Sequence, residues 1–168
     1  MKANLIVEGK EFPIEINDPE LQKLIEQPHK TGYERVKLGE IFYSLDPYGS
    51  VCEPTEDDTE HRDNVYRCGN YYSSKMVALN NSHADKLMRQ LRRFSMEHGG
   101  NKIDWNNSKQ NKYYIHCITD CNMLDIGHTQ LDRNIFTIYF ENYDAAALAI
   151  GYFHDELTWY FTEYKDSL

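Results

Sequence analysis

Apolar and polar residues alternate near the start of the chain and predict two short β-strands, at residues 3–7 and 11–16. Glu8-Gly9-Lys10 lies between them and has the composition of a tight turn. A short helix is expected next, with Asp18 as its N-cap and Pro19 at its first position. Its apolar face has helical spacing and consists of Leu21, Leu24 and Ile25, and Pro28 ends it. Residues 1–30 are therefore predicted to form a ββα unit.

The next section, residues 31–100, begins with a pattern typical of short strands. Extended segments are expected at 33–36 and 40–45, before the turn sequence Asp46-Pro47-Tyr48-Gly49 and a resumed strand at Val51-Cys52. Residues 53–63 are almost entirely polar and are predicted to form a solvated loop. The chain then leads to Tyr71-Tyr72, which we expect at the end of a further strand.

A long helix is predicted from Ser74, a favourable N-cap residue, to about Met96. Gly99-Gly100 supplies its stop signal. Its apolar positions have helical spacing and are Ala84, Leu87, Met88, Leu91 and Phe94.

The last section, residues 101–168, repeats this order after a polar linker at 101–111 that contains one Trp. Strands are expected at 112–118, 123–128 and 135–140, and Asn142 is expected to cap a final helix. The buried face of that helix is predicted to be Ala145, Ala146, Ala149, Ile150, Phe153 and Leu157, with 158–164 continuing it.

The whole pattern predicts an α+β fold of short antiparallel strands covered by helices, in a single domain spanning residues 1–168. Sections 31–100 and 101–168 each read as three strands and a helix, so the ββα unit is followed by two similar βββα units. The spacing from Tyr71-Tyr72 to Ser74 and Ala78 equals that from Tyr139-Phe140 to Asn142 and Ala146. This spacing favours an internal repeat, although strand–cap–helix junctions share this chemistry in general.

Composition limits the classes of function. The net charge is −9, which disfavours nucleic-acid binding by the chain as a whole. The charge is uneven, because residues 86–112 carry seven basic and two acidic residues between two acidic segments. The sequence has neither a signal-peptide pattern nor a long apolar run, which predicts a cytoplasmic protein with its four cysteines reduced. The 13 tyrosines fit either strand packing or an interface.

The sequence resembles a family of small proteins from phages and prophages of gut and related bacteria. The resemblance is carried by GNYYSS (69–74) with its helix, Trp105-Asn106-Asn107, KYYI (112–115), and IYF (138–140) followed by the Ala-rich helix to 157. Small acidic phage accessory proteins often resemble inhibitors of bacterial defence systems, including anti-CRISPR proteins. The resemblance therefore implies an anti-defence role in the host cell.

Two charged sets are candidate partner-binding sites. The acidic set lies in the 53–63 run and consists of Glu53, Glu56, Asp57, Asp58, Glu60 and Asp63. A dense row of carboxylates can imitate nucleic acid in a basic groove, whereas the simpler interpretation is a solvated loop. The basic set is Lys86, Arg89 and Arg93, at i, i+3 and i+7 on one side of the predicted helix, with Arg92 near its margin.

Catalytic and metal signals are weak. The chain contains no Walker A loop, dinucleotide-binding glycine pattern, zincin helix or nucleophile elbow. The best metal candidates are His116, Cys117, Cys121 and His128, but successive strand residues face opposite sides. We predict no catalytic residue, no metal site and no cofactor.

Three functions remain open. The leading hypothesis is a non-enzymatic inhibitor that binds a bacterial defence nuclease such as a CRISPR effector, alone or together with its guide RNA. Such effectors hold nucleic acid in basic channels, which acidic segments would fit. The second is a protein that sequesters a signalling nucleotide of the defence response, with Tyr-rich faces for the base and Arg89 or Arg93 for phosphate. The third is a nuclease or hydrolase with an unrecognised site. No membrane partner is expected.

Overall fold

The computed structural model describes residues 2–7, 10–15 and 30–164, with side chains from residue 30 onward. The chain divides into two compact units, residues 1–31 and 32–168. In the first unit, β1 (Lys2–Val7) pairs antiparallel with β2 (Lys10–Glu15), from Lys2 opposite Glu15 to Val7 opposite Lys10. The two strands expected there are confirmed, while the helix expected at 18–28 lies outside the described residues.

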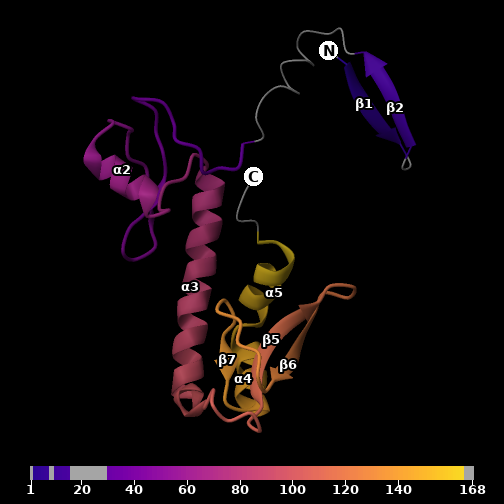
Figure 1. The fold of residues 1–168 in the computed structure, drawn as a ribbon. Helices are drawn as coiled ribbons and strands as arrows, with labels where there is room; N and C mark the ends of the chain where they lie inside the picture. The colour runs from indigo at the N-terminus through magenta and orange to yellow at the C-terminus, as the bar shows by residue number, and fades with distance from the viewer. Residues whose placement is uncertain (1, 8–9, 16–29, 165–168) are drawn as a thin grey trace. The chain divides into compact units, whose positions relative to one another are not determined.

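The second unit is built on the long helix α3 (Lys75–Glu97). Its N-cap is Ser74, whose hydroxyl accepts a hydrogen bond from the Val77 amide, and it ends before Gly99, whose φ of 92° is left-handed. Figure 1 shows α2 (Glu60–Arg67) beside one end of α3, and the three-stranded sheet beside the other. The predicted limits of this helix are therefore confirmed.

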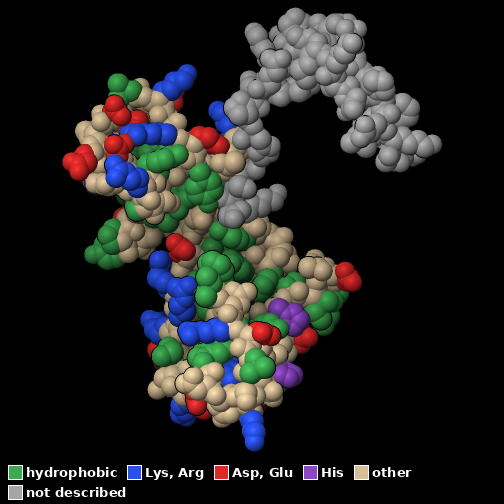
Figure 2. All heavy atoms as spheres, in the orientation of Figure 1, with side chains coloured by type: hydrophobic (Ala, Val, Ile, Leu, Met, Phe, Trp, Pro, Cys, Tyr) green, Lys and Arg blue, Asp and Glu red, His purple; other side chains and the backbone are tan. Residues whose placement is uncertain are grey.

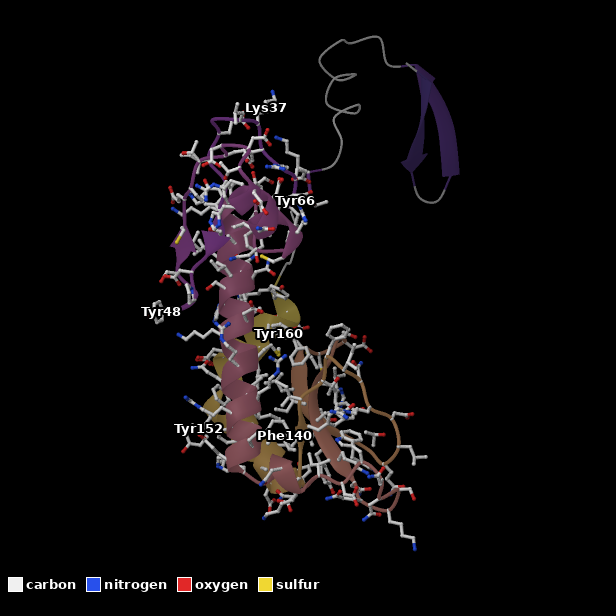
Figure 3. All side chains as sticks on the ribbon, turned by 60° about the vertical axis from the view of Figure 1, so that its left-hand side comes forward. Lys37, Tyr48, Tyr66, Phe140, Tyr152 and Tyr160 are labelled. Carbon is white, nitrogen blue, oxygen red and sulfur yellow. The ribbon has the colours of Figure 1, made fainter. Side chains whose placement is uncertain are left out.

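Residues 32–72, which we call the α2 lobe, contain little regular β-strand. β3 (Ser44–Leu45) and β4 (Val51–Cys52) pair antiparallel across the predicted turn, in which the Asp46 carboxylate accepts from the amides of Tyr48 and Ser50. Tyr48 projects from the tip of this turn (Figure 3). The segment 33–36, expected to be extended, forms no strand.

The prediction that residues 53–63 form a solvated loop is wrong. Residues 60–63 belong to helix α2 (Glu60–Arg67), and Glu56 is buried. α2 has no buried residue, so apolar periodicity could not reveal it. Acidic residues in its first turn and Arg67 in its last turn suit the helix dipole and favour a helix here.

Residues 100–164, which we call the sheet lobe, begin with a short 3₁₀ turn, η1 (Gly100–Lys102). β5 (Lys112–Ile118) is central in the sheet, between β6 (Met123–Thr129) and β7 (Tyr139–Phe140), and both pairings are antiparallel. Two helices follow: α4 (Tyr143–Tyr152), capped by Asn142 as predicted, and α5 (His154–Thr162). The α+β class is thus shown.

Two expectations for this lobe are wrong in detail. The strand expected at 135–140 shrinks to two residues, because the Asn134 side chain accepts from the Phe136 amide and the Asn134 carbonyl accepts from the Thr137 amide, which turns the backbone. The single final helix is broken at Phe153, which packs edge-on against Phe94 at 5.6 Å between ring centroids. The break allows Leu157 to be buried in the same core.

Two hydrophobic clusters form the core of the described part of this unit. α3 spans both, with Val77 and Ala78 in the smaller cluster of the α2 lobe. The larger cluster lies between α3, α4, α5 and the sheet, and Phe140 lies between α3 and the sheet (Figure 3). It consists of Leu87, Leu91, Phe94, Phe140, Ala145, Ala146, Ala149 and Leu157. Among the described residues, no helix is both long and apolar enough to cross a membrane.

The proposed internal repeat has a counterpart in strand pairing. In the sheet lobe, β5 pairs with both the following strand and the segment before the capped helix. The α2 lobe has the same order, because β3 pairs with β4 while Tyr43 forms an antiparallel bridge with Tyr72, just before Ser74. α2 interrupts the order and the strands are much shorter, so duplication stays a prediction.

Candidate functional site

The acidic set folds around one arginine. Glu56 is only 3 % exposed, and its two carboxylate oxygens accept from Nε and Nη2 of Arg35 at 3.1 and 3.0 Å. The Tyr71 hydroxyl also donates to Glu56 Oε2, at 2.7 Å. Arg35 further contacts Asp63 at 2.5 Å and Asp58 at 3.5 Å. This bidentate, charge-assisted geometry is typical of a structural ion pair.

Cations also neutralise other members of the acidic set. Asp57 lies 3.3 Å from Arg62 Nε, and Glu53 lies 2.6 Å from Lys75 Nζ. Of the six acids, only Glu60 has no ion pair within the described residues. Figure 2 shows acidic and basic side chains interspersed over the α2 lobe. The region therefore has a surface of mixed positive and negative charge. It lacks the row of free carboxylates on which mimicry of nucleic acid would depend.

The same contacts shift several pKa values. Hydrogen bonds from Arg35, against the effect of burial, lower the pKa of Glu56 to about 2. Burial, with Glu56 close by, raises the pKa of Tyr71 to about 12. The hydrogen bond from Thr59 lowers the pKa of Asp57, and the hydrogen bond to Glu53 raises the pKa of Lys75. Each shift favours the state in which these groups hold the lobe together.

The basic set lies on exposed positions of α3, as predicted, but its members do not converge on one cavity. Arg93 is 3.8 Å from Glu97 along the helix. Arg89 lines a shallow pocket of the α2 lobe that also contains Asp46 and Asp85. Figure 2 shows the blue side chains in a row along α3.

A larger pocket, of about 540 Å³, lies where α3 meets the sheet lobe. We call it the Trp105 pocket. α3 contributes Arg92, Ser95 and Met96, the η1 region contributes Gly100, Ile103 and Trp105, and the segment before and into β7 contributes Arg133, Asn134, Ile135, Thr137, Ile138 and Tyr139. Its volume is in the range of small-molecule sites, and its lining combines apolar and aromatic side chains with two arginines.

Trp105 is held in place by local turns and by neighbouring rings. The Asp104 carboxylate accepts from the Asn106 amide, and the Asn107 amide donates to the Asp104 carbonyl, which forms a turn around Trp105. The indole lies edge-on to Tyr139, with 4.9 Å between ring centroids. The Arg133 guanidinium lies 5.0 Å from the indole centroid, which is a cation–π contact.

A second cation lies against the same indole. The side chain of Lys112 is fully buried, and its ammonium donates to the carbonyls of Asn107 and Gln130 at 2.7 and 2.8 Å. Its Nζ is 5.5 Å from the Trp105 ring centroid. Within residues 30–164 no carboxylate pairs with this lysine. A buried ammonium with only neutral partners adds positive potential beside the pocket.

The two arginines of the Trp105 pocket are exposed, and neither forms an ion pair with any described residue. One comes from α3 and the other from the β6–β7 connection, so tertiary folding brings them to the same cavity. Ser95 fixes the spacing of these elements, because its buried hydroxyl donates to the Tyr139 carbonyl at 2.5 Å. The pocket can thus offer two guanidinium groups to one anionic ligand.

Tyr139 also holds the loop that carries Arg133. Its hydroxyl accepts from the Asn134 amide at 2.9 Å and donates to the Asp132 carbonyl at 3.4 Å. The Asp132 amide in turn donates to the Thr129 hydroxyl at the end of β6. The wall of the pocket is therefore supported by hydrogen bonds to the sheet.

Comparison with protein-family models, with curated proteins and with solved structures finds no match to this chain. The assignment of a function therefore depends on the geometry of the site itself.

The cysteine and histidine residues within 30–164 do not gather. His116 lies 3.7 Å from Asp125, on the opposite face of β5 from Cys117, and Cys121 is exposed in the turn after β5. No group of three or more His, Cys, Asp or Glu side chains in the described part of the chain is arranged to hold a metal ion.

Sequence reasoning missed most of the Trp105 pocket. The sequence places Arg92 only at the margin of the basic set, and Trp105 only in a polar linker and in one of the motifs that carry the resemblance. Two signals were present: an indole in a segment with almost nothing else to bury, and Arg133 as one of two bases in the acidic last third. Neither shows that the two residues meet, because that depends on the β6–β7 loop.

Proposed function

We propose that the protein binds a nucleotide in the Trp105 pocket, in agreement with the second of the functions open from the sequence. The observation that carries this proposal is the pair Arg92 and Arg133, both without an acidic partner among the described residues, which line one cavity together with Trp105 and Tyr139. Guanidinium groups recognise phosphate in bidentate fashion, and the aromatic side chains of the lining, Trp105 and Tyr139, offer apolar surface for a base. The buried Lys112 adds attraction for an anion.

The residues proposed to bind phosphate differ from those expected from the sequence. Arg93 is paired with Glu97, and Arg89 faces a pocket with carboxylates, so neither is the expected phosphate ligand. Arg92 and Arg133 take that role. Sequestration of a defence signal, as implied by the phage resemblance, is the biological role that this binding would serve.

Isothermal titration calorimetry with AMP, GMP, CMP and UMP tests the proposal. Ribose 5-phosphate and adenosine serve as controls that lack the base and the phosphate. We expect binding of at least one nucleotide, and a Kd raised about tenfold or more by Arg92→Ala or Arg133→Ala, since a charge-assisted hydrogen bond contributes about 1.5–3 kcal/mol.

Arg93→Ala is the matched control, because Arg93 is the next residue of the same helix, carries the same charge and lies outside the pocket. It is expected to leave Kd within about twofold at moderate ionic strength. Equal effects of Arg92→Ala and Arg93→Ala, or no binding by any of the four nucleotides, would contradict the proposal.

Inhibition of a defence nuclease is a second candidate, favoured by one separate observation. The β6–β7 loop exposes three apolar side chains: Leu131 at 74 %, Ile135 at 81 % and Phe136 at 83 %. Adjacent exposed apolar residues are typical of protein contact surfaces. Co-purification with CRISPR nucleases, with and without guide RNA, tests this candidate. A stable complex in either condition supports it, and its absence in both removes it.

A further inference from the structure

The two faces of the three-stranded sheet differ in their surroundings. Tyr113 and Ile115 of β5, with Leu124 and Ile126 of β6, lie on the helical side and pack against the larger cluster. The alternate residues of β5 are Lys112, Tyr114, His116 and Ile118, and none of them belongs to a cluster. Lys112 is buried, with its ammonium against Trp105, whereas the other three side chains are half-buried or exposed. The second face of the sheet is therefore open from Tyr114 onward within the described structure.

A row of aromatic rings crosses from the Trp105 pocket onto this open face. The ring-centroid distances are 4.9 Å from Trp105 to Tyr139, 6.0 Å from Tyr139 to Tyr114, and 5.9 Å from Tyr114 to His116. The first two pairs are edge-on, at 82° and 75° between planes. Aromatic side chains spaced along an open sheet face are the usual platform on which unstacked bases bind.

Gly127 fixes the position of Tyr114. It lies directly opposite Tyr114 in the β5–β6 pairing, and a Cβ atom at Gly127 would stand 2.6 Å from Tyr114 Cζ. The tyrosine ring therefore lies across the backbone of β6, where only glycine leaves room for it. The Tyr114 ring therefore packs against the surface of the sheet and does not project away from it.

A second pocket, of about 310 Å³, lies over this part of the sheet, and we call it the Tyr114 pocket. It shares Asn134, Thr137 and Tyr139 with the Trp105 pocket, so the two cavities adjoin. Asp132 belongs to the Tyr114 pocket, whereas both arginines belong to the Trp105 pocket. The charges favour phosphate in the Trp105 pocket and an uncharged base in the Tyr114 pocket.

From this arrangement we infer that the ligand carries two bases joined by a phosphodiester, one base on Trp105 and the second on Tyr114. The inference rests on the proposed nucleotide function and narrows it to a dinucleotide. Asp132, beside the Tyr114 pocket, and Asp125, paired with His116, would repel the phosphates of a longer strand. A ligand of two nucleotides is thus favoured over a long single strand.

The test compares three ligands with the full-length protein. These are 5′-AMP, adenosine 3′,5′-bisphosphate (pAp) and the 5′-phosphorylated dinucleotide pApA. pAp has the second phosphate but no second nucleoside, and its 3′-phosphate carries more negative charge than the diester of pApA, so tighter binding of pApA reports a favourable contact with the second nucleoside. We expect pApA to bind about tenfold tighter than pAp, from the usual contribution of one stacked base.

Two variants test whether the second base binds against Tyr114. Tyr114→Ala removes the ring, and Gly127→Ala displaces it, so each is expected to weaken pApA to the level of pAp while leaving pAp unchanged. Tyr114→Phe keeps the ring and is expected to keep the full affinity. An unchanged far-ultraviolet circular dichroism spectrum, an unchanged thermal unfolding midpoint to within a few degrees, and unchanged pAp binding show that the variants are folded.

The outcomes distinguish failure of the second base site from failure of the proposed nucleotide binding. Equal binding of pApA and pAp by the wild-type protein overturns the second base site but leaves nucleotide binding intact. No binding of any of the three ligands, together with no binding of GMP, CMP or UMP, overturns both. A five-nucleotide strand that binds about tenfold or more tighter than pApA overturns the limit of two bases.

Discussion

At the scale of single residues, the acidic set shows that the role of a charged side chain depends on its partners. Glu56 is buried because Arg35 and Tyr71 satisfy both carboxylate oxygens. Tyr71 itself stacks on Phe42 at 4.1 Å, so the ion pair closes over the aromatic centre of the α2 lobe. A carboxylate in this position stabilises the fold and is unavailable to a partner.

The first prediction at this scale concerns acid. The folded-state pKa of Glu56, about 2, lies below its ordinary value of 4.5. Its contribution to the free energy of unfolding is therefore complete above pH 4.5 and is lost as the pH falls toward 2. We expect Glu56→Gln to lower the free energy of unfolding by about 2–3 kcal/mol at pH 7, below the cost of breaking a fully buried pair, because Arg35 is one-third exposed and keeps Asp63.

Urea unfolding at pH 7 and pH 3 measures this effect. The gap between wild type and Glu56→Gln is expected to be smaller at pH 3 than at pH 7. Glu60→Gln is the control, since Glu60 is exposed and has no ion pair among the described residues, and its curve is expected to follow the wild type within about 0.5 kcal/mol. A gap that stays constant or widens in acid would show that the Arg35 pair does not hold the lobe.

At the scale of elements, features that depend on local chemistry could be predicted from the sequence, whereas features that depend on tertiary packing could not. Ser74 and Asn142 were predicted as caps from their side chains alone, and each accepts the expected amide hydrogen bond. α3 was predictable because its buried apolar residues recur at helical spacing along its whole length. α2 buries no residue and left no periodic signal.

The same division explains what could be predicted of the candidate site. The basic residues on α3 follow from helical spacing, but which of them faces a cavity depends on where η1 and the β6–β7 loop pack. That loop is shaped by Asn134 and by the hydroxyl of Tyr139, whose contacts the sequence does not reveal. Arg92, Trp105 and Arg133 therefore become a site only in the folded chain.

At the scale of the whole molecule, one helix joins two small cores. Val77 and Ala78 belong to the cluster of the α2 lobe, whereas Leu87, Leu91 and Phe94 belong to that of the sheet lobe. Tyr164 reinforces the join, because its hydroxyl donates to the Asn81 side chain in the middle of α3. The two lobes are thus expected to unfold as one cooperative unit.

The last prediction follows from this division of the chain. Both hydrophobic clusters of the described residues draw only on residues of the second unit, 32–168. A chain truncated to residues 31–168 is therefore expected to fold, with a melting temperature within about 4 °C of the full-length protein, which for this size corresponds to about 1 kcal/mol. Differential scanning calorimetry checks the midpoint, and the truncated chain should also bind the same nucleotides. A truncated chain that fails to unfold cooperatively, or that melts far lower, would mean that residues 1–30 complete the core of the second unit.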